Sequence, residues 1–237
     1  MSARVLIRGP LACFTRPEMK VERMSYPVMT PSAARGVLEA ILYKPQFRWW
    51  VRSIHVLEPI RFIGLRRNEV KEKAPGLRTI NRWMAGKSIH PIFADATEEE
   101  AGDDKHGRTQ RNTVALKDVG YVIEADVWVR PGIKESPAKY YECFDRRVKR
   151  GQCFVQPVLG CREFAGYFEP APDQLATISE NRDLGLMLYD VFDLDAENDG
   201  FAKPFITLFN PSLTNGVMEI ESWASVKARH FRGGSHA

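Results

Sequence analysis

The chain has 237 residues, of which 44% are hydrophobic and 27% charged, so a globular fold with one large or two small domains is expected. No segment approaches the roughly 18 apolar residues of a membrane span, and we do not expect the charged start MSARVLIRG to be a signal peptide. We therefore expect a cytoplasmic protein that makes no membrane contact.

The net charge is distributed unevenly along the chain. Residues 1–162 contain 29 Lys and Arg against 18 Asp and Glu, a net charge of +11, whereas residues 163–237 contain 5 against 12, a net charge of −7. A surplus of this kind most often serves to neutralise phosphates, so the first part predicts a nucleic-acid partner.

The first half of the chain alternates strand and helix patterns. Residues 3–9 alternate in hydrophobicity and predict a strand, and Thr30 before Pro31 marks the start of a helix over about 32–43. Residues 47–67 are rich in aromatic and β-branched residues and predict one long strand, or two with a bend at Pro59. The polar residues 67–111 predict an excursion from the core, part hairpin and part loop.

The second half continues the same alternation. Residues 112–130 predict a long strand pair or one bent strand. Ser136–Gln152 predicts a basic amphipathic helix closed by Gly151, and residues 153–170 predict a further strand. The order strand, helix, strand, strand, helix, strand predicts an α+β fold, with a ferredoxin-like βαββαβ core of the RNA-recognition type. After Pro170 the chain predicts a small β-rich C-terminal domain over 171–237, so the first domain would span 1–170.

Motifs for cofactors and metals are missing from the sequence. No Gly-x-Gly-x-x-Gly, Walker A or Gly-x-Ser-x-Gly pattern occurs, none of the five histidines stands at metal spacing to another, and the four cysteines form no Cys-x-x-Cys pair. We expect no cofactor and no metal.

What remains is a set of cations interleaved with aromatic residues on one predicted strand and one predicted helix. Aromatic faces can stack on bases while cations hold phosphates. Trp49, Trp50 and Tyr141 at these spacings are more often core residues. The cations predicted to bind RNA are Arg48, Arg52, Arg146, Arg147, Lys149 and Arg150.

Four stretches of the chain then carry a resemblance to a known family. They are SYPVMTPSAARGVLEAILYKPQFRW (25–49), VLEPIRF (56–62), QRNTVALKDVGYVIEADV (110–127) and LGCREFAGYF (159–168), with a weaker match in LFNPSLTNGVMEI (208–220). In family order and over most of the chain, they resemble the CRISPR-associated Cas-five family, subtype d, of type I-C (Dvulg) systems.

This resemblance implies a specific function. It implies an endoribonuclease that cleaves the repeats of precursor CRISPR RNA without a metal, by attack of the 2′-hydroxyl to give a 2′,3′-cyclic phosphate. The protein would then stay on the 5′ handle of the mature CRISPR RNA, among the other subunits of the type I-C Cascade complex in antiviral defence. Residues 67–111 would form a thumb-like insertion.

The resemblance also implies the catalytic residues. The family has a tyrosine two residues before a Lys-Pro, where this chain has Leu42, followed by Tyr43. The family's Lys-His pair at the start of the second helix falls on Lys139 and Tyr140, so the candidate catalytic residues are Lys139, Tyr140 and Tyr43. Lys139 could stabilise the phosphorane and lower the pKa of a neighbouring phenol.

Two other functions compete with this one. The chain could be a nonenzymatic RNA-binding subunit of Cascade, since residue 140 is tyrosine where the family has histidine. It could also be a protein that binds duplex nucleic acid, including double-stranded DNA, without specificity for RNA.

Overall fold

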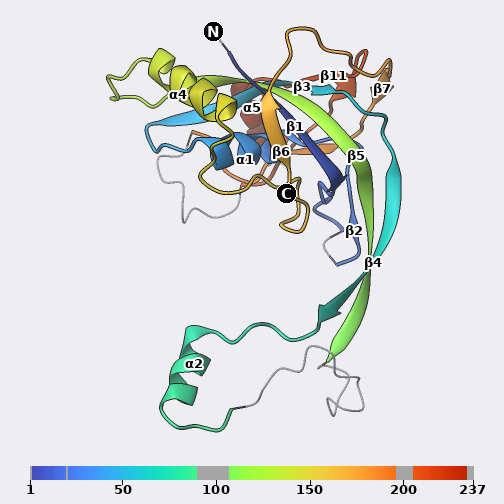
Figure 1. The fold of residues 1–237 in the computed structure, drawn as a ribbon, viewed down its shortest axis with the longest axis vertical. Helices are drawn as coiled ribbons and strands as arrows, with labels where there is room; N and C mark the ends of the chain where they lie inside the picture. Colours follow the sequence, from blue (N-terminus) through green and yellow to red (C-terminus); the bar gives the residue numbers. More distant parts are fainter. Residues whose placement is uncertain (1, 20, 90–106, 196–204, 234–237) are drawn as a thin grey trace. The chain divides into compact units, whose positions relative to one another are not determined.

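The computed structural model describes residues 2–19, 21–89, 107–195 and 205–233 (Figure 1). The fold is mixed α and β, and the described residues contain four helices and a large antiparallel sheet. Contacts divide the chain into two compact units, one of residues 1–63 with 114–237 and one of Gly64–Thr113. Residues on both sides of position 170 lie in the first unit. The domain boundary expected near residue 170 stays a prediction.

Five strands of the first unit form the main path of the sheet, in the order β11-β3-β5-β1-β6. They are β1 (Ala3–Ala12), β3 (Phe47–Val56), β5 (Arg108–Val129), β6 (Tyr167–Pro170) and β11 (Val217–Glu219). All four neighbouring pairs are antiparallel. In the central pair Ile7 lies opposite Tyr121, and both side chains are buried. The predicted strands at 3–9 and 112–130 are confirmed.

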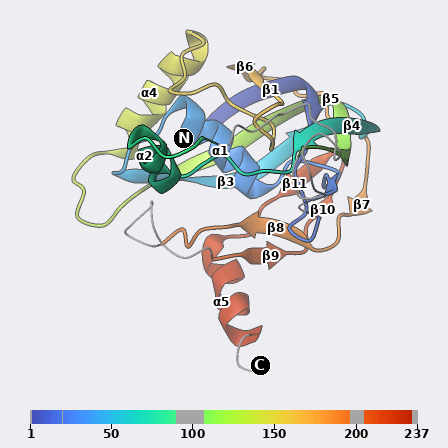
Figure 2. The same cartoon turned by 90° about the horizontal axis from the view of Figure 1, so that it is seen from below.

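Helices α1 (Pro31–Ile41) and α4 (Pro137–Lys149) cover one face of this sheet (Figure 2). Each begins as the sequence predicted, with a side-chain cap followed by proline: Thr30 accepts a hydrogen bond from the Ala33 amide, and Ser136 accepts one from the Ala138 amide. Aromatic rings join α4 to β3, because Phe144 packs edge-on against Trp49 with ring centroids 4.8 Å apart. Trp49 is therefore a core residue.

The stretch 47–67 forms two strands, β3 and β4 (Phe62–Val70), with Pro59 in the break between them, so the expected alternative of two strands is confirmed. The strand predicted over 153–170 is wrong for most of its length, since only β6 is a strand there. The loop before β6 packs tightly on β1: Gly160 has φ +87°, and a Cβ on it would lie 2.1 Å from the Cys13 carbonyl oxygen. Backbone contact of this closeness needs glycine, so Gly160 marks a packed loop.

The second unit contains parts of β4 and β5 and the helix α2 (Leu77–Met84). Within it, Arg67 donates from Nε to the Thr113 hydroxyl at 3.0 Å and pairs with Glu69 at 2.8 Å. None of the side chains of α2 is buried. The helix lies in the predicted excursion at 67–111, and the thumb role of that excursion stays a prediction. The acidic residues 98–104 lie outside the described residues.

Short strands and a final helix complete the first unit. β2 (Arg23–Met24) pairs with β5, β10 (Ser212–Leu213) pairs with β7 (Arg182–Asp183), and β8 (Met187–Asp190) pairs with β9 (Thr207–Phe209). The helix α5 (Trp223–Gly233) was not predicted. Its Trp223 is buried against the ring of Tyr189, a contact that sequence periodicity does not reveal. No helix in the described ranges is long and apolar enough to cross a membrane.

Candidate active site at the ends of helices α1 and α4

The first turn of α4 brings two of the three candidate catalytic residues together. Glu135 lies just before the helix, and its carboxylate accepts a hydrogen bond from Lys139 Nζ at 2.5 Å and another from the Tyr140 hydroxyl. Lys139 is largely exposed, whereas Tyr140 is 3% exposed and packs on the Phe47 ring at 4.5 Å between centroids. The site thus presents an ammonium group to solvent and holds a phenol at its edge.

Burial and Glu135 together determine the protonation state of Tyr140. Burial, followed by the hydrogen bond to Glu135, raises the pKa of Tyr140 to about 12. The hydrogen bonds from Lys139 and Tyr140 lower the pKa of Glu135. The expectation that Lys139 lowers the pKa of Tyr140 is wrong for the free protein, because the carboxylate lies between them. At neutral pH the phenol is therefore a proton donor and not an acceptor.

A cavity of about 310 Å³ opens beside these residues. Three cations line it, from the segment after α1, the start of α4 and the third turn of α4: Lys44, Lys139 and Arg146. Its remaining lining residues are Leu42, Gln46, Glu135, Tyr140, Glu142 and Cys143. Three cations around a small open cavity form a suitable site for a phosphate group.

Tyr43, the third candidate, does not line this cavity. Leu42, which does, is fully buried, and Tyr43 next to it points outward with 46% of its surface exposed. The structure thus brings Lys139 and Tyr140 together. Tyr43 lies just after the C-terminal end of α1, outside the lining of the cavity. Its catalytic role stays a prediction.

Three consecutive carbonyl groups at the C-terminal end of α1 accept hydrogen bonds from other parts of the chain. The Ala40 oxygen accepts from the Phe154 amide at 2.7 Å, the Ile41 oxygen from Arg147 Nη1 at 2.6 Å, and the Leu42 oxygen from the Trp49 indole at 2.9 Å. These are carbonyls that a helix end leaves without partners inside the helix. The loop after α4, α4 itself and β3 are thereby fixed to the wall of the cavity.

The six cations predicted to bind RNA divide into three groups. Arg146, Lys149 and Arg150 are exposed on α4 and its C-cap, and Arg52 is exposed on β3, 3.5 Å from Asp126. Arg147 holds α1 as described, so part of its role is structural. Arg48 is only 6% exposed, and a direct phosphate contact would require its side chain to leave this position. RNA binding by these residues stays a prediction.

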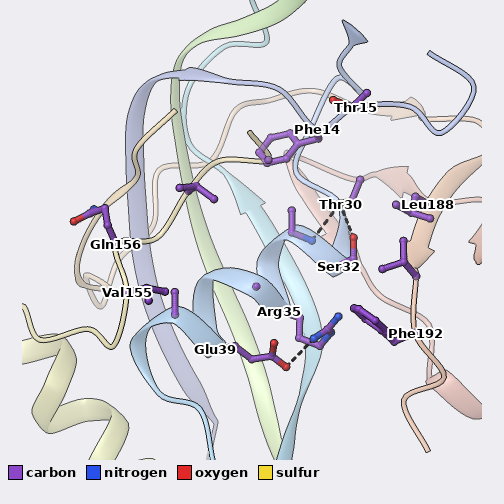
Figure 3. A pocket seen from close by; sticks show the side chains of 16 residues that line it. Phe14, Thr15, Thr30, Ser32, Arg35, Glu39, Val155, Gln156, Leu188 and Phe192 are labelled. Atoms are coloured by element: carbon purple, nitrogen blue, oxygen red, sulfur yellow. Dashed lines mark hydrogen bonds and ion pairs between the residues drawn. The ribbon is translucent and has the colours of Figure 1, made fainter. Parts of the chain in front are cut away.

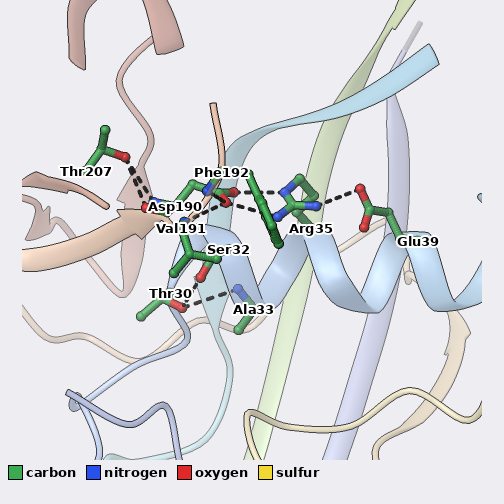
Figure 4. A network of polar contacts seen from close by, with 9 residues as sticks. All are labelled: Thr30, Ser32, Ala33, Arg35, Glu39, Asp190, Val191, Phe192 and Thr207. Carbon is green, nitrogen blue, oxygen red and sulfur yellow. Dashed lines mark hydrogen bonds and ion pairs between the residues drawn. The ribbon is translucent and has the colours of Figure 1, made fainter. Parts of the chain in front are cut away.

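A second cavity, of about 490 Å³, runs along α1 between the loop at Val155–Gln156 and the segment Leu188–Phe192 (Figure 3). At its edge, Arg35 makes a two-pronged ion pair with Asp190, at 2.8 and 3.0 Å, and a third bond to Glu39 at 2.7 Å (Figure 4). This network joins α1 to β8 at the edge of the cavity.

Sequence reasoning missed several of these residues. Glu135 stands four residues before Lys139, a spacing that favours an ion pair on a helix and was the one available signal. Lys44 belongs to the Lys-Pro of the family pattern, a signal that was used only to place the tyrosine. Asp190 gave no local signal, because its partner Arg35 is 155 residues away in sequence. Over the described part of the chain, no group of three or more His, Cys, Asp or Glu is placed to hold a metal ion.

Comparison with known proteins identifies the family. Residues 4–220 match the family Cas_Cas5d, described as CRISPR-associated protein (Cas_Cas5). A Mannheimia succiniciproducens protein named CRISPR pre-crRNA endoribonuclease Cas5d is 43% identical over 226 residues, which cover 92% of this chain and 93% of that protein. A Thermus thermophilus protein of the same name is 44% identical over 229 residues, which cover 97% of this chain and 86% of that protein.

A solved structure described as a CRISPR-associated protein shares the fold, with a TM-score of 0.63 and 20% identity over 95% of this chain and 94% of that chain. The family resemblance inferred from the sequence is therefore confirmed: the chain belongs to the Cas5d family of CRISPR-associated proteins.

Proposed function

We propose that this protein is an endoribonuclease that cleaves the repeats of precursor CRISPR RNA and stays on the 5′ handle as a Cascade subunit. The observation that carries the proposal is the identity of 43–44% over nearly the whole chain to two relatives named pre-crRNA endoribonucleases. The cation-lined cavity at Lys139 supports it, because cleavage develops extra negative charge on a phosphate.

The fold that we propose for this function is a ferredoxin-like core. The elements β1, α1, β3, β5, α4 and β6 follow one another in the order βαββαβ, and the strand order β3-β5-β1-β6 is the one that this motif forms. We propose that residues 67–111, within the second unit, act as the thumb-like insertion and that 171–237 form a C-terminal β extension. The four free cysteines agree with a cytoplasmic location.

Cleavage begins when the 2′-hydroxyl of the nucleotide before the cut attacks the adjacent phosphorus. The new bond forms a 2′,3′-cyclic phosphate, the 5′-oxygen bond breaks, and the leaving oxygen takes a proton. Lys139 lies where it can offset the charge on the phosphorane, with Lys44 and Arg146 lining the same cavity. In the free protein Glu135 holds Lys139, and a bound phosphate would take the place of this carboxylate.

Tyr140 fits the role of the proton donor to the leaving 5′-oxygen. Its pKa of about 12 keeps the phenol protonated at neutral pH. The proton of the 2′-hydroxyl passes to solvent water, or to Tyr43 if this residue enters the reaction as its phenolate. Because these groups need no metal, we expect cleavage to continue in a chelator.

The test is single-turnover cleavage of the cognate repeat RNA in EDTA, beside a binding titration. Lys139→Ala is expected to slow cleavage on the order of 10²–10³-fold, by analogy with the loss of one oxyanion donor. Binding should fall only modestly, because other cations hold the RNA. Lys134→Ala, a lysine before the helix that does not line the cavity, is the matched control. Full activity of Lys139→Ala would refute the assignment of this lysine.

The competing function is a nonenzymatic RNA-binding subunit of Cascade. The specific observation in its favour is that tyrosine stands at residue 140, with a raised pKa. Tight binding of the repeat by the wild-type protein with no cleavage would decide for it, and equal affinity for duplex DNA would decide for a nonspecific duplex-binding protein.

A further inference from the structure

The loop after α4 presents exposed apolar side chains on a fixed backbone. Phe154 is 77% exposed and Val155 is 55% exposed. Their amides both donate to the Ala40 oxygen, at 2.7 and 3.2 Å, and Gln156 bonds from Nε2 to the Gly166 oxygen at 2.6 Å. The loop is therefore anchored on α1 on one side and on the segment before β6 on the other. It holds a phenyl ring in solvent at a defined place.

A single exposed apolar side chain needs no explanation, but this one is not isolated. Tyr43, 46% exposed, lies at the same end of α1, three residues after the carbonyl that holds Phe154. Leu42, two residues after that carbonyl, lines the candidate active site. The exposed ring of Tyr43 thus lies at the end of α1 on which the Phe154 loop is anchored, and Val155 and Gln156 of this loop line the second cavity, along α1.

The charges around these rings indicate what covers them. The last turn of α4 carries three cations, Arg146, Arg147 and Lys149, and Arg150 follows as the C-cap. Aromatic faces among cations bind single-stranded nucleic acid, since the rings stack on bases and the cations hold phosphates. A protein partner that buried Phe154 would also have to bury or pair these cations, which is costly. The surroundings therefore favour RNA.

We propose that Phe154 is a stacking platform for an unpaired base of the repeat RNA, beside the cations at the end of α4. The proposal rests on the proposed function and adds a substrate contact to it. The residue would contribute to binding and to the placement of the strand on this surface. It takes no part in bond making or breaking.

The experiment measures the affinity of Phe154 variants for the cognate repeat RNA with a 2′-deoxy nucleotide at the cleaved position. Phe154→Ala is expected to weaken binding about 5-fold to 150-fold, the range found when one base loses its aromatic partner. Phe154→Trp should bind like the wild type, whereas Phe154→Leu should bind like Phe154→Ala, because leucine is apolar but has no π face. The slope of affinity against salt should stay unchanged in all three, since no phosphate contact is lost.

Two controls make the result specific. Tyr167→Ala removes an aromatic ring of similar exposure, 65%, from β6, where it lies beside Arg8, and should leave affinity unchanged. Abasic nucleotides introduced one at a time into the RNA should weaken wild-type binding at one position by the same factor, and that position should have no further effect on Phe154→Ala.

Wild-type affinity in Phe154→Ala would overturn the proposal, as would full rescue by Phe154→Leu. Intact RNA binding combined with lost association with the other Cascade subunits would also overturn it and assign the surface to a protein partner. If the wild-type protein itself neither binds nor cleaves the repeat, the proposed function fails together with the inference. If it does both and Phe154→Ala is silent, the inference fails alone.

Discussion

The ion pair between Arg35 and Asp190 allows a quantitative prediction for the substitution Asp190→Ala. Asp190 is 2% exposed, and its two oxygens accept from Arg35 Nε at 2.8 Å and Nη2 at 3.0 Å. Its Oδ1 also accepts the amides of Val191 and Phe192, at 2.7 and 3.0 Å. Burial alone would lower the pKa of Arg35, but Asp190 and Glu39 together raise it, so the guanidinium stays charged.

The expected loss follows from what the substitution leaves behind. Arg35 would keep only Glu39, at 2.7 Å, and the charge would stay 7% exposed in an apolar surrounding that includes the Phe192 ring at 5.5 Å. Removal of one partner of a buried pair costs about 3–5 kcal/mol in the free energy of unfolding. The two amides that lose an acceptor place the value toward the upper end of that range. Asp190→Asn, which keeps an oxygen at this place, should cost less.

The assay is urea unfolding followed by tryptophan fluorescence, with the free energy taken by linear extrapolation. Glu180→Ala is the control, because it breaks an exposed pair with Arg182 at 3.1 Å and should cost at most about 1 kcal/mol. The double variant Arg35→Met/Asp190→Leu should recover most of the loss, since no buried charge remains. A loss under about 1 kcal/mol for Asp190→Ala, or a double variant that is no more stable than the single one, would refute this reasoning.

Three further predictions concern the candidate site and the sheet. Tyr140→Phe should slow single-turnover cleavage about 10²–10⁴-fold with repeat affinity unchanged, since it removes only a proton donor; an equal cleavage rate would exclude that role. Arg147→Ala should lower both RNA affinity and the free energy of unfolding, because Arg147 also holds the Ile41 oxygen, whereas Arg150→Ala should lower affinity alone; equal stability of the two variants would contradict the structural role. Burial, opposed in part by Glu124, lowers the pKa of His55 below its ordinary value of 6.5, so the unfolded chain takes up a proton first as the pH falls. The stability that His55 contributes is thus complete above about pH 6.5 and is lost below it. His55→Asn should flatten this part of the pH dependence of unfolding, and an unchanged profile would argue against it.

Local physical chemistry determined the main elements of this fold. The caps Thr30 and Ser136, each before a proline, set the starts of α1 and α4, because these residues satisfy or do not need the free amides of a first turn. Hydrophobic alternation set β1 and β5. The clustered cations of α4 and the family motifs identified the region of Lys139, because both are contiguous in sequence.

Only the tertiary structure decided which residues share a site and which are buried. Arg48 and Arg52 have the same chemistry and lie on one strand, but one is 6% exposed and the other is exposed, a difference that depends on what covers each end of the sheet. The loop before β6 was predicted as a strand because its composition is strand-like, and its close contact with Cys13 outweighs that preference. Arg147 and Phe154 donate hydrogen bonds to carbonyls of α1 that lie more than 100 residues earlier in the chain. The ion pair of Arg35 with Asp190 spans 155 residues. Contacts of this range leave no periodic trace, since they arise only when the chain closes on itself.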